Sequence, residues 1–112
     1  MFKIEKPKEI TWPVTISIPR DGGNTTKATF TGKFKLLPQT EFNAIYSNGG
    51  TDDDLIRNAM TGWGEDMCDE SGQPLQYNDD NLSMIAAVPY IRAAIIAAYL
   101  ELSHGKKAGA KN

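Results

Sequence analysis

Two stretches in the first third of the chain alternate between hydrophobic and polar residues with a period of two. They cover residues 10–18 and 25–36 and are rich in β-branched and aromatic side chains, which is typical of half-buried strands. The turn residues 21–24, Asp-Gly-Gly-Asn, predict an antiparallel hairpin between them. Pro13 and Pro19 cannot donate hydrogen bonds to a ladder, so we expect the first strand at the edge of its sheet. The apolar positions of the two strands are Ile10, Trp12, Val14, Ile16 and Ile18, and Ala28, Phe30, Phe34 and Leu36.

Hydrophobic residues then recur at helical spacing in two short segments. Pro38 suits the first turn of a helix, and the Asn-Gly-Gly run at residues 48–50 ends that helix. Thr51 and Asp54 have the spacing of a capping box at the start of a second helix, which the glycine-flanked Trp63 is expected to break. The apolar sides of the two helices are Phe42, Ile45 and Tyr46, and Leu55, Ile56, Ala59 and Met60.

Turn residues also divide the segment that follows. Residues 65–77 predict a small second hairpin around the turn at 69–72, Asp-Glu-Ser-Gly. Asn78 can cap the next helix, and Pro89 disfavours helical geometry at the residue before it, so a break is expected there. The buried side of this third helix is expected to be Leu82, Ile85 and Ala86.

The last predicted helix, residues 89–103, has too little polarity for a helix that is exposed on one side. Between Pro89 and Leu102 only Arg92 and Glu101 carry charge, whereas a surface helix normally has a polar face. The hydrophobic surplus must therefore contact another part of this chain or another chain.

These elements predict an α+β fold, in which an N-terminal antiparallel β-hairpin packs on a C-terminal helical part with a small second hairpin. A length of 112 residues suits one domain, which we place at residues 1–104. Gly105 is a helix stop, and the residues after it contain no apolar anchor, so residues 105–112 are predicted to be a flexible tail.

Composition and charge exclude several classes of function. The net charge of −2 and the pI of about 5.3 give no electrostatic reason to expect binding to nucleic acid. The last helix falls short of the roughly 20 apolar residues of a membrane span, and the start of the chain has no apolar signal region. Cys68 is the single cysteine, so no internal disulfide forms, which fits a reducing compartment.

The sequence predicts neither a catalytic centre nor a bound metal or cofactor. The acidic triplet at residues 52–54 suits helix capping and lacks further metal ligands. A calcium loop that began at Asp66 would need oxygen ligands and a glycine at positions where this chain has other residues. Cys68 gains no help in ionising from its acidic surroundings, and His104 suits the negative end of a helix dipole.

Residues 62–99 carry a pattern that resembles the tail assembly chaperones of long-tailed bacteriophages. The pattern combines glycines around a tryptophan, an Asp-x-x-Gly turn, an acidic helix start and an Ala-Tyr pair. Its members in this chain are Gly62-Trp63-Gly64, Asp69 with Gly72, Pro74-Leu75, Tyr77, Asp79-Asp80, Leu82, Pro89 and Ala98-Tyr99.

The resemblance implies a non-enzymatic protein that binds the tape-measure protein and tail-tube subunits during tail assembly, that self-associates, and that works in the cytoplasm of an infected or lysogenic bacterial host. Trp63 is either a core residue or an aromatic anchor of a binding surface. The predicted protein-binding surface consists of Trp63, Tyr90, Ile91, Ile95, Ile96, Tyr99 and Leu102. The alternatives are a structural tail or head–tail connector subunit of a phage particle, and a small ligand-binding protein or enzyme.

Overall fold

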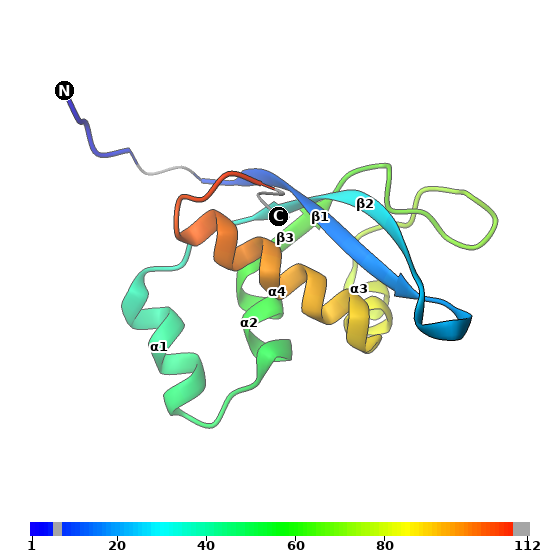
Figure 1. Ribbon diagram of the computed structural model, residues 1–112. Helices are drawn as coiled ribbons and strands as arrows, with labels where there is room; N and C mark the ends of the chain where they lie inside the picture. Colours follow the sequence, from blue (N-terminus) through cyan, green and yellow to red (C-terminus); the bar gives the residue numbers. More distant parts are fainter. Residues whose placement is uncertain (6–7, 109–112) are drawn as a thin grey trace.

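A three-stranded antiparallel sheet and four helices make up the fold in a computed structural model that describes residues 1–5 and 8–108 (Figure 1). The sheet has the order β1-β2-β3, and α2, α3 and α4 gather on one side of it. The predicted α+β class is therefore confirmed. In chain order the elements are β1 (Ile10–Pro19), the short helix η1 (Asp21–Gly23), β2 (Thr25–Phe34), α1 (Gln39–Ser47), α2 (Asp52–Ala59), β3 (Met60–Trp63), α3 (Asp79–Ala86) and α4 (Pro89–Ser103).

The N-terminal hairpin forms as its alternation predicts. β1 and β2 pair in register from Ile10 opposite Phe34 to Pro19 opposite Thr25, and β1 lies at an edge of the sheet. Two positions differ from the prediction, because Ala28 and Leu36 are exposed. Ala28 lies toward the η1 end of the hairpin, which extends past the helices (Figure 1).

Leu36 is exposed because β2 ends at Phe34 and the alternation does not continue beyond it. The alternation of β2 holds through the buried Phe34, although the ladder with β3 is irregular between Lys33 and Phe34. The backbone N–H of Lys35 then donates to the carbonyl of Ala59 at 2.8 Å. Leu37 takes the buried position that the simple alternation assigns to Leu36.

The strand β3 was not predicted. Trp63 and its glycine neighbours do end the preceding helix, but the chain continues in extended form and pairs Gly32 with Trp63 and Phe34 with Met60. The predicted second hairpin is reduced to a loop, residues 64–78, with one isolated bridge between Cys68 and Pro74. Two backbone hydrogen bonds flank that bridge, Leu75 N–H to Met67 O at 2.8 Å and Asp69 N–H to Gln73 O at 2.9 Å.

The helix ends follow their sequence signals. Thr51 and Asp54 form the capping box of α2, and the Asn78 side chain accepts from the N–H of Asn81 at the start of α3. At the other end of the fold, Gly105 has a φ of 70° and its N–H donates to Leu102 O, while the N–H of Lys106 donates to Glu101 O. This pair of bonds is a Schellman motif. Of the predicted tail that begins here, residues 109–112 lie outside the described residues.

The break at Pro89 turns the chain sharply between α3 and α4. Among residues 1–5 and 8–108 no single helix is long and apolar enough to cross a membrane, and α3 and α4 pass that test only as a pair bent by 102°.

The last helix lies at the centre of the molecule, which explains its composition. α4 packs against β1, α2 and α3, so hydrophobic side chains on several of its faces contact other parts of the same chain. Many of the hydrophobic side chains of α4 are thus covered by other parts of the same chain. The buried core consists of Val14, Ile16, Phe30, Phe34, Leu37, Leu55, Ile56, Ala59, Met60, Trp63, Met67, Leu82, Ile85, Ala86, Ile95, Ala98, Tyr99 and Leu102.

Candidate protein-binding surface

The seven residues predicted to form a binding surface divide into two groups. Four of them are core residues, with exposed fractions of 1% for Ile95, 2% for Tyr99, 7% for Trp63 and 8% for Leu102. The prediction that these four are available to a partner is wrong, because their side of α4 packs against β1, α2 and α3, and Trp63 in β3 packs against the loop 64–78. Tyr90, Ile91 and Ile96 remain exposed or half-buried.

Trp63 holds the loop 64–78 against the sheet. Its indole N–H donates to the carbonyl of Leu75 at 2.7 Å, and its ring meets the edge of Tyr77 at a centroid distance of 4.8 Å and an angle of 80°. The hydroxyl of Tyr77 in turn donates to Met60 O at 2.9 Å. Of the two interpretations that the sequence left open for Trp63, the structure therefore supports the core residue.

Tyr99 packs in the core at the end that lies next to α1. Its hydroxyl accepts the backbone N–H of Leu37 at 3.0 Å, and this bond is buried. Its ring stacks with Phe42 at 6.2 Å and 8° and lies 6.3 Å from Phe34. Tyr90, on the opposite side of the helix, is 37% exposed, so one of the two tyrosines is inside and the other outside.

The solvent-facing side of α4 is mostly apolar, and the half-buried Glu101 lies at its edge beside Ala97. We call this side the outer face of α4; it consists of Tyr90, Ala93, Ile96, Ala97 and Leu100, all exposed or half-buried. The two charged residues of the helix are held by other groups. The guanidinium of Arg92 donates to Ala86 O at 2.9 Å, and the carboxylate of Glu101 accepts from the indole of Trp12 at 3.1 Å.

The outer face of α4 continues into a cleft at the C-terminal end of the helix. The cleft has a volume of about 330 Å³ and separates the end of α4 from the start of α1. Leu36, which is 45% exposed, and the half-buried Phe42 form its apolar wall together with Leu100. The sequence missed Leu36, Ala93 and Ala97 as surface residues; the one available signal was the absence of charge along the helix.

A second apolar depression lies at the opposite end of α4. We call it the acidic groove: a cavity of about 560 Å³ between the loop 64–78, α3 and the first turn of α4. Met84, which is 55% exposed, is its most accessible apolar residue. Its lining consists of Met67, Cys68, Asp69, Glu70, Ser71, Leu75, Met84, Ile85 and Ile91.

The turn at the rim of the acidic groove carries a fixed negative charge. The carboxylate of Asp69 accepts from the Ser71 hydroxyl at 2.7 Å, from the Ser71 N–H at 2.9 Å and from the Gln73 N–H at 3.0 Å. These hydrogen bonds, with that of the Ser71 hydroxyl the largest contribution, lower the pKa of Asp69 below its ordinary value. Asp69 is therefore ionised at neutral pH.

The candidate chemical groups are dispersed rather than collected. Within the described ranges, 1–5 and 8–108, no three His, Cys, Asp or Glu side chains are placed to share a metal ion. In the acidic triplet, Asp54 accepts from the N–H of Thr51 at 2.8 Å and Asp53 pairs with Arg57 at 2.9 Å. Cys68 lies in the loop 64–78 and His104 at the far end of α4, so the fold does not bring the thiol and the imidazole together.

No protein-family model, curated protein or solved structure matches this chain. The resemblance to phage tail assembly chaperones stays a prediction from the pattern at residues 62–99. In the structure that segment contains the end of β3, the loop 64–78, α3 and most of α4, and so it contributes to both the outer face of α4 and the acidic groove.

Proposed function

We propose that this protein is a non-enzymatic tail assembly chaperone of a long-tailed bacteriophage. It binds an apolar helical segment of the tape-measure protein and brings tail-tube subunits to it, in the cytoplasm of the bacterial host. The observation that carries the proposal is the outer face of α4, an apolar, solvent-facing strip on a helix whose other side packs in the core. The pattern at residues 62–99 supplies the identity of the partners.

The outer face of α4 has the chemistry of a helix-binding surface. Ala93 and Ala97 are one turn apart and exposed, so a second helix could approach the backbone of α4 closely there. Ile96 and Leu100 offer larger side chains beside them, and the cleft with Leu36 and Phe42 extends the apolar track. An amphipathic helix that lays its apolar side along such a strip is a common mode of peptide recognition.

The matching partner is a helix with small and aliphatic residues on one side. α4 has 15 residues, which corresponds to a length of about 22 Å or roughly four helical turns. A long helical tape-measure protein offers many such segments in succession. One chaperone molecule would shield one of them from aggregation until the tube subunits replace it.

The test is the capture of a purified tape-measure fragment by immobilised protein. Ala97→Asp places a charge at the centre of the outer face of α4 and should weaken capture at least about thirtyfold, which is typical of a central contact residue. Ala44→Asp in α1 is the matched control, because Ala44 is also an exposed helical alanine, and it should bind as the unmodified protein does. Equal capture by both variants would show that α4 is not the binding surface.

Mass spectrometry of purified virions distinguishes the chaperone from a structural subunit. A chaperone is absent from the finished particle, whereas a tail or head–tail connector subunit remains in it. Detection of this chain in stoichiometric amount would replace the proposal with the structural role.

A further inference from the structure

We infer that residues Met1–Glu5 of one copy dock in the acidic groove of a second copy, so that molecules associate head to tail. This inference goes beyond the proposed function and gives a structural form to the self-association that the resemblance at residues 62–99 implies. We call residues Met1–Glu5 the arm.

The arm presents large apolar side chains to solvent. Phe2 is 85% exposed and Ile4 is 82% exposed, and Met1 is fully exposed. In extended chain, residues two apart lie on the same side, so Phe2 and Ile4 share one side while Lys3 points to the other. An isolated apolar residue on a surface is ordinary, but three within four residues mark an interaction site.

The chain is held against the sheet at the start of β1. The carboxylate of Glu9 accepts from the hydroxyl of Thr61 at 2.7 Å, and the next residue, Ile10, begins the β1–β2 ladder. The arm lies away from the sheet and the helices, and none of its residues belongs to the core (Figure 1). Its apolar side chains are therefore available to another molecule.

The acidic groove suits the arm in size and polarity. Its apolar floor is formed by Leu75, Ile85 and Ile91, with the exposed Met84 beside them. A volume of about 560 Å³ lies within the range of pockets that bury small ligands, so it is large enough for two side chains of the size of Phe2 and Ile4. Asp69 and Glu70 also line the groove, so Lys3 of a docked arm would lie near carboxylates.

Charge along the chain reinforces the match. Residues 58–91, which include the acidic groove, contain six acidic residues and no lysine or arginine. Residues 1–36, which include the arm, contain seven basic and three acidic residues, a net charge of +4. Complementary charges of this kind steer association and fix its orientation.

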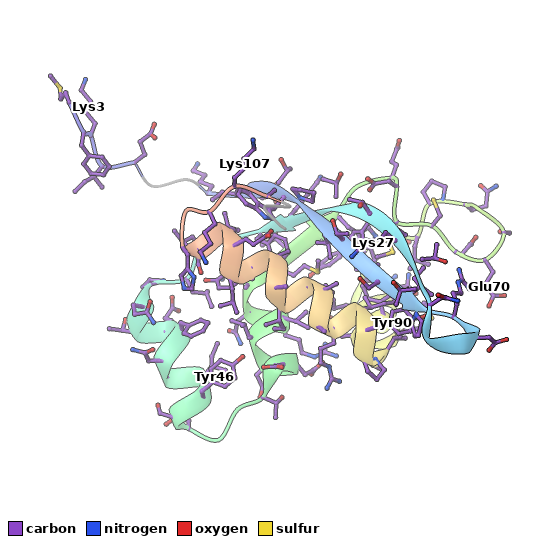
Figure 2. The ribbon with its side chains drawn as sticks, viewed as in Figure 1. Lys3, Lys27, Tyr46, Glu70, Tyr90 and Lys107 are labelled. Atoms are coloured by element: carbon purple, nitrogen blue, oxygen red, sulfur yellow. The ribbon has the colours of Figure 1, made fainter. Side chains whose placement is uncertain are left out.

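The arm and the acidic groove lie at opposite ends of the molecule. Lys3 and Glu70 are far apart on opposite sides in Figure 2, and β1 and α4 run between them. A contact between arm and groove therefore joins two copies through different surfaces. Such heterologous contacts generate rings or open chains rather than closed twofold dimers.

Cysteine cross-linking between two variants tests the contact directly. Cys68 lines the acidic groove and is the single cysteine of the chain, so the unmodified protein is the groove partner. The arm partner is Phe2→Cys with Cys68→Ser, and the control is Ser47→Cys with Cys68→Ser, whose cysteine lies on exposed α1. Under mild oxidation the arm partner should form the mixed disulfide at least about tenfold faster than the control. Equal rates for the two would overturn the inference.

Charge reversal provides a second, independent test by sedimentation. Lys3→Glu and Glu70→Lys should each raise the self-dissociation constant about tenfold, and the two together should restore it, because every contact then pairs the reversed charges. Glu41→Lys, on α1, makes the same charge change as Glu70→Lys and should leave association unchanged. The inference fails if the double variant associates no better than the single ones, or if the unmodified protein is monomeric at all concentrations.

The failure of this inference can be separated from the failure of the proposed function. Phe2→Asp with Ile4→Asp removes the arm contact but leaves the outer face of α4 intact. It should lose self-association and retain capture of the tape-measure fragment, whereas Ala97→Asp should show the reverse. If no variant, nor the unmodified protein, captures the fragment while cross-linking to Cys68 proceeds, the proposed function fails and the head-to-tail contact stands.

Discussion

The helices α1 and α4 bury their residues in the reverse of the way that their sequence patterns suggest. α1 has the spaced apolar stripe and polar remainder of a surface helix, yet none of its residues is buried. α4 has no polar face, yet it buries Ile95, Ala98, Tyr99 and Leu102 and leaves an apolar strip exposed. A cleft of about 350 Å³ separates α1 from α2, whereas α4 is packed between the sheet and two helices. Position in the fold, rather than the strength of the pattern, decides how much a helix buries.

The largest difference is expected when a charge is placed on each helix. Ile95→Asp puts a carboxylate into the core without a partner and should unfold the protein, at a cost of more than about 4 kcal/mol. Ile45→Asp, on α1, replaces a half-buried residue beside an open cleft and should cost about 1 kcal/mol. Urea denaturation followed by circular dichroism measures both.

The burial of each residue also decides which substitutions on α4 can test binding. Ile96 is half-buried and on the outer face of α4, so Ile96→Asp should fold and weaken capture of a partner helix. A variant that carries both Ile95→Asp and Ile96→Asp would lose binding because it is unfolded. A cooperative unfolding transition of Ile95→Asp close to that of the unmodified protein would contradict the central place of α4.

Removal of a tyrosine hydroxyl from each helix gives the second prediction. Tyr99→Phe leaves the buried N–H of Leu37 without its acceptor and should cost about 1–3 kcal/mol. Tyr46→Phe breaks an exposed bond to Asp52, whose oxygen is 2.8 Å from the hydroxyl, and should cost less than about 0.5 kcal/mol. The difference between the two free energies of unfolding is the measurement, and equal costs would show that α1 is as firmly packed as α4.

Amide hydrogen exchange sharpens the comparison without any substitution. α1 has no side-chain cap at its start, contains no buried residue and is linked to α2 by few contacts. Local opening needs least free energy where buried apolar contacts are few. The amides of Phe42–Ser47 should therefore exchange through local opening, and those of the centre of α4 only through global unfolding. Identical protection from exchange in both helices would show that α1 opens no more easily than α4.

The parts of the fold that the sequence predicts depend on neighbours along the chain. The alternation of β1, the capping box of Thr51 and Asp54, and the stop at Gly105 all form as expected, because each involves residues a few positions apart or a turn between paired strands. β3 was missed because Gly62 and Gly64 read as helix-breaking residues. The pairing of Trp63 with Gly32 is a contact across 31 positions that no local pattern encodes.

The candidate binding surface could likewise be predicted only in part from local sequence patterns. The sequence correctly marks α4 as unusually apolar, but it cannot tell which side of a helix without a polar face is covered. Ile95 and Ile96 are chemically identical neighbours, and only the position of the sheet and α2 makes one a core residue and the other accessible. The acidic groove combines the loop 64–78 with Met84 and Ile91 from two helices that meet at 102°. Its existence depends on that angle, which the sequence indicates only as a break at Pro89.

The smallest expected effect is the titration of the hydroxyl that links α1 to α2. Burial, followed by the hydrogen bond to Asp52 and the negative charge of Asp52, raises the pKa of Tyr46 to about 12. Because the folded pKa lies above the ordinary value of about 10, the neutral phenol stabilises the fold. That contribution is fully present below about pH 10 and is lost as the pH rises toward 12.

Ultraviolet absorbance of tyrosinate measures this titration. Asp52→Asn keeps a hydrogen-bond acceptor but removes the charge, and it should move the pKa of Tyr46 down while burial keeps it above the ordinary value. Tyr77 is the internal control, because its pKa is raised by burial, and then by the charge of Asp79, without any contribution from Asp52. If Asp52→Asn leaves the Tyr46 transition unchanged, the hydroxyl does not bind Asp52 in solution. α1 would then be held to the rest of the molecule by the partial burial of Phe42 and Ile45 alone, which would widen its contrast with α4.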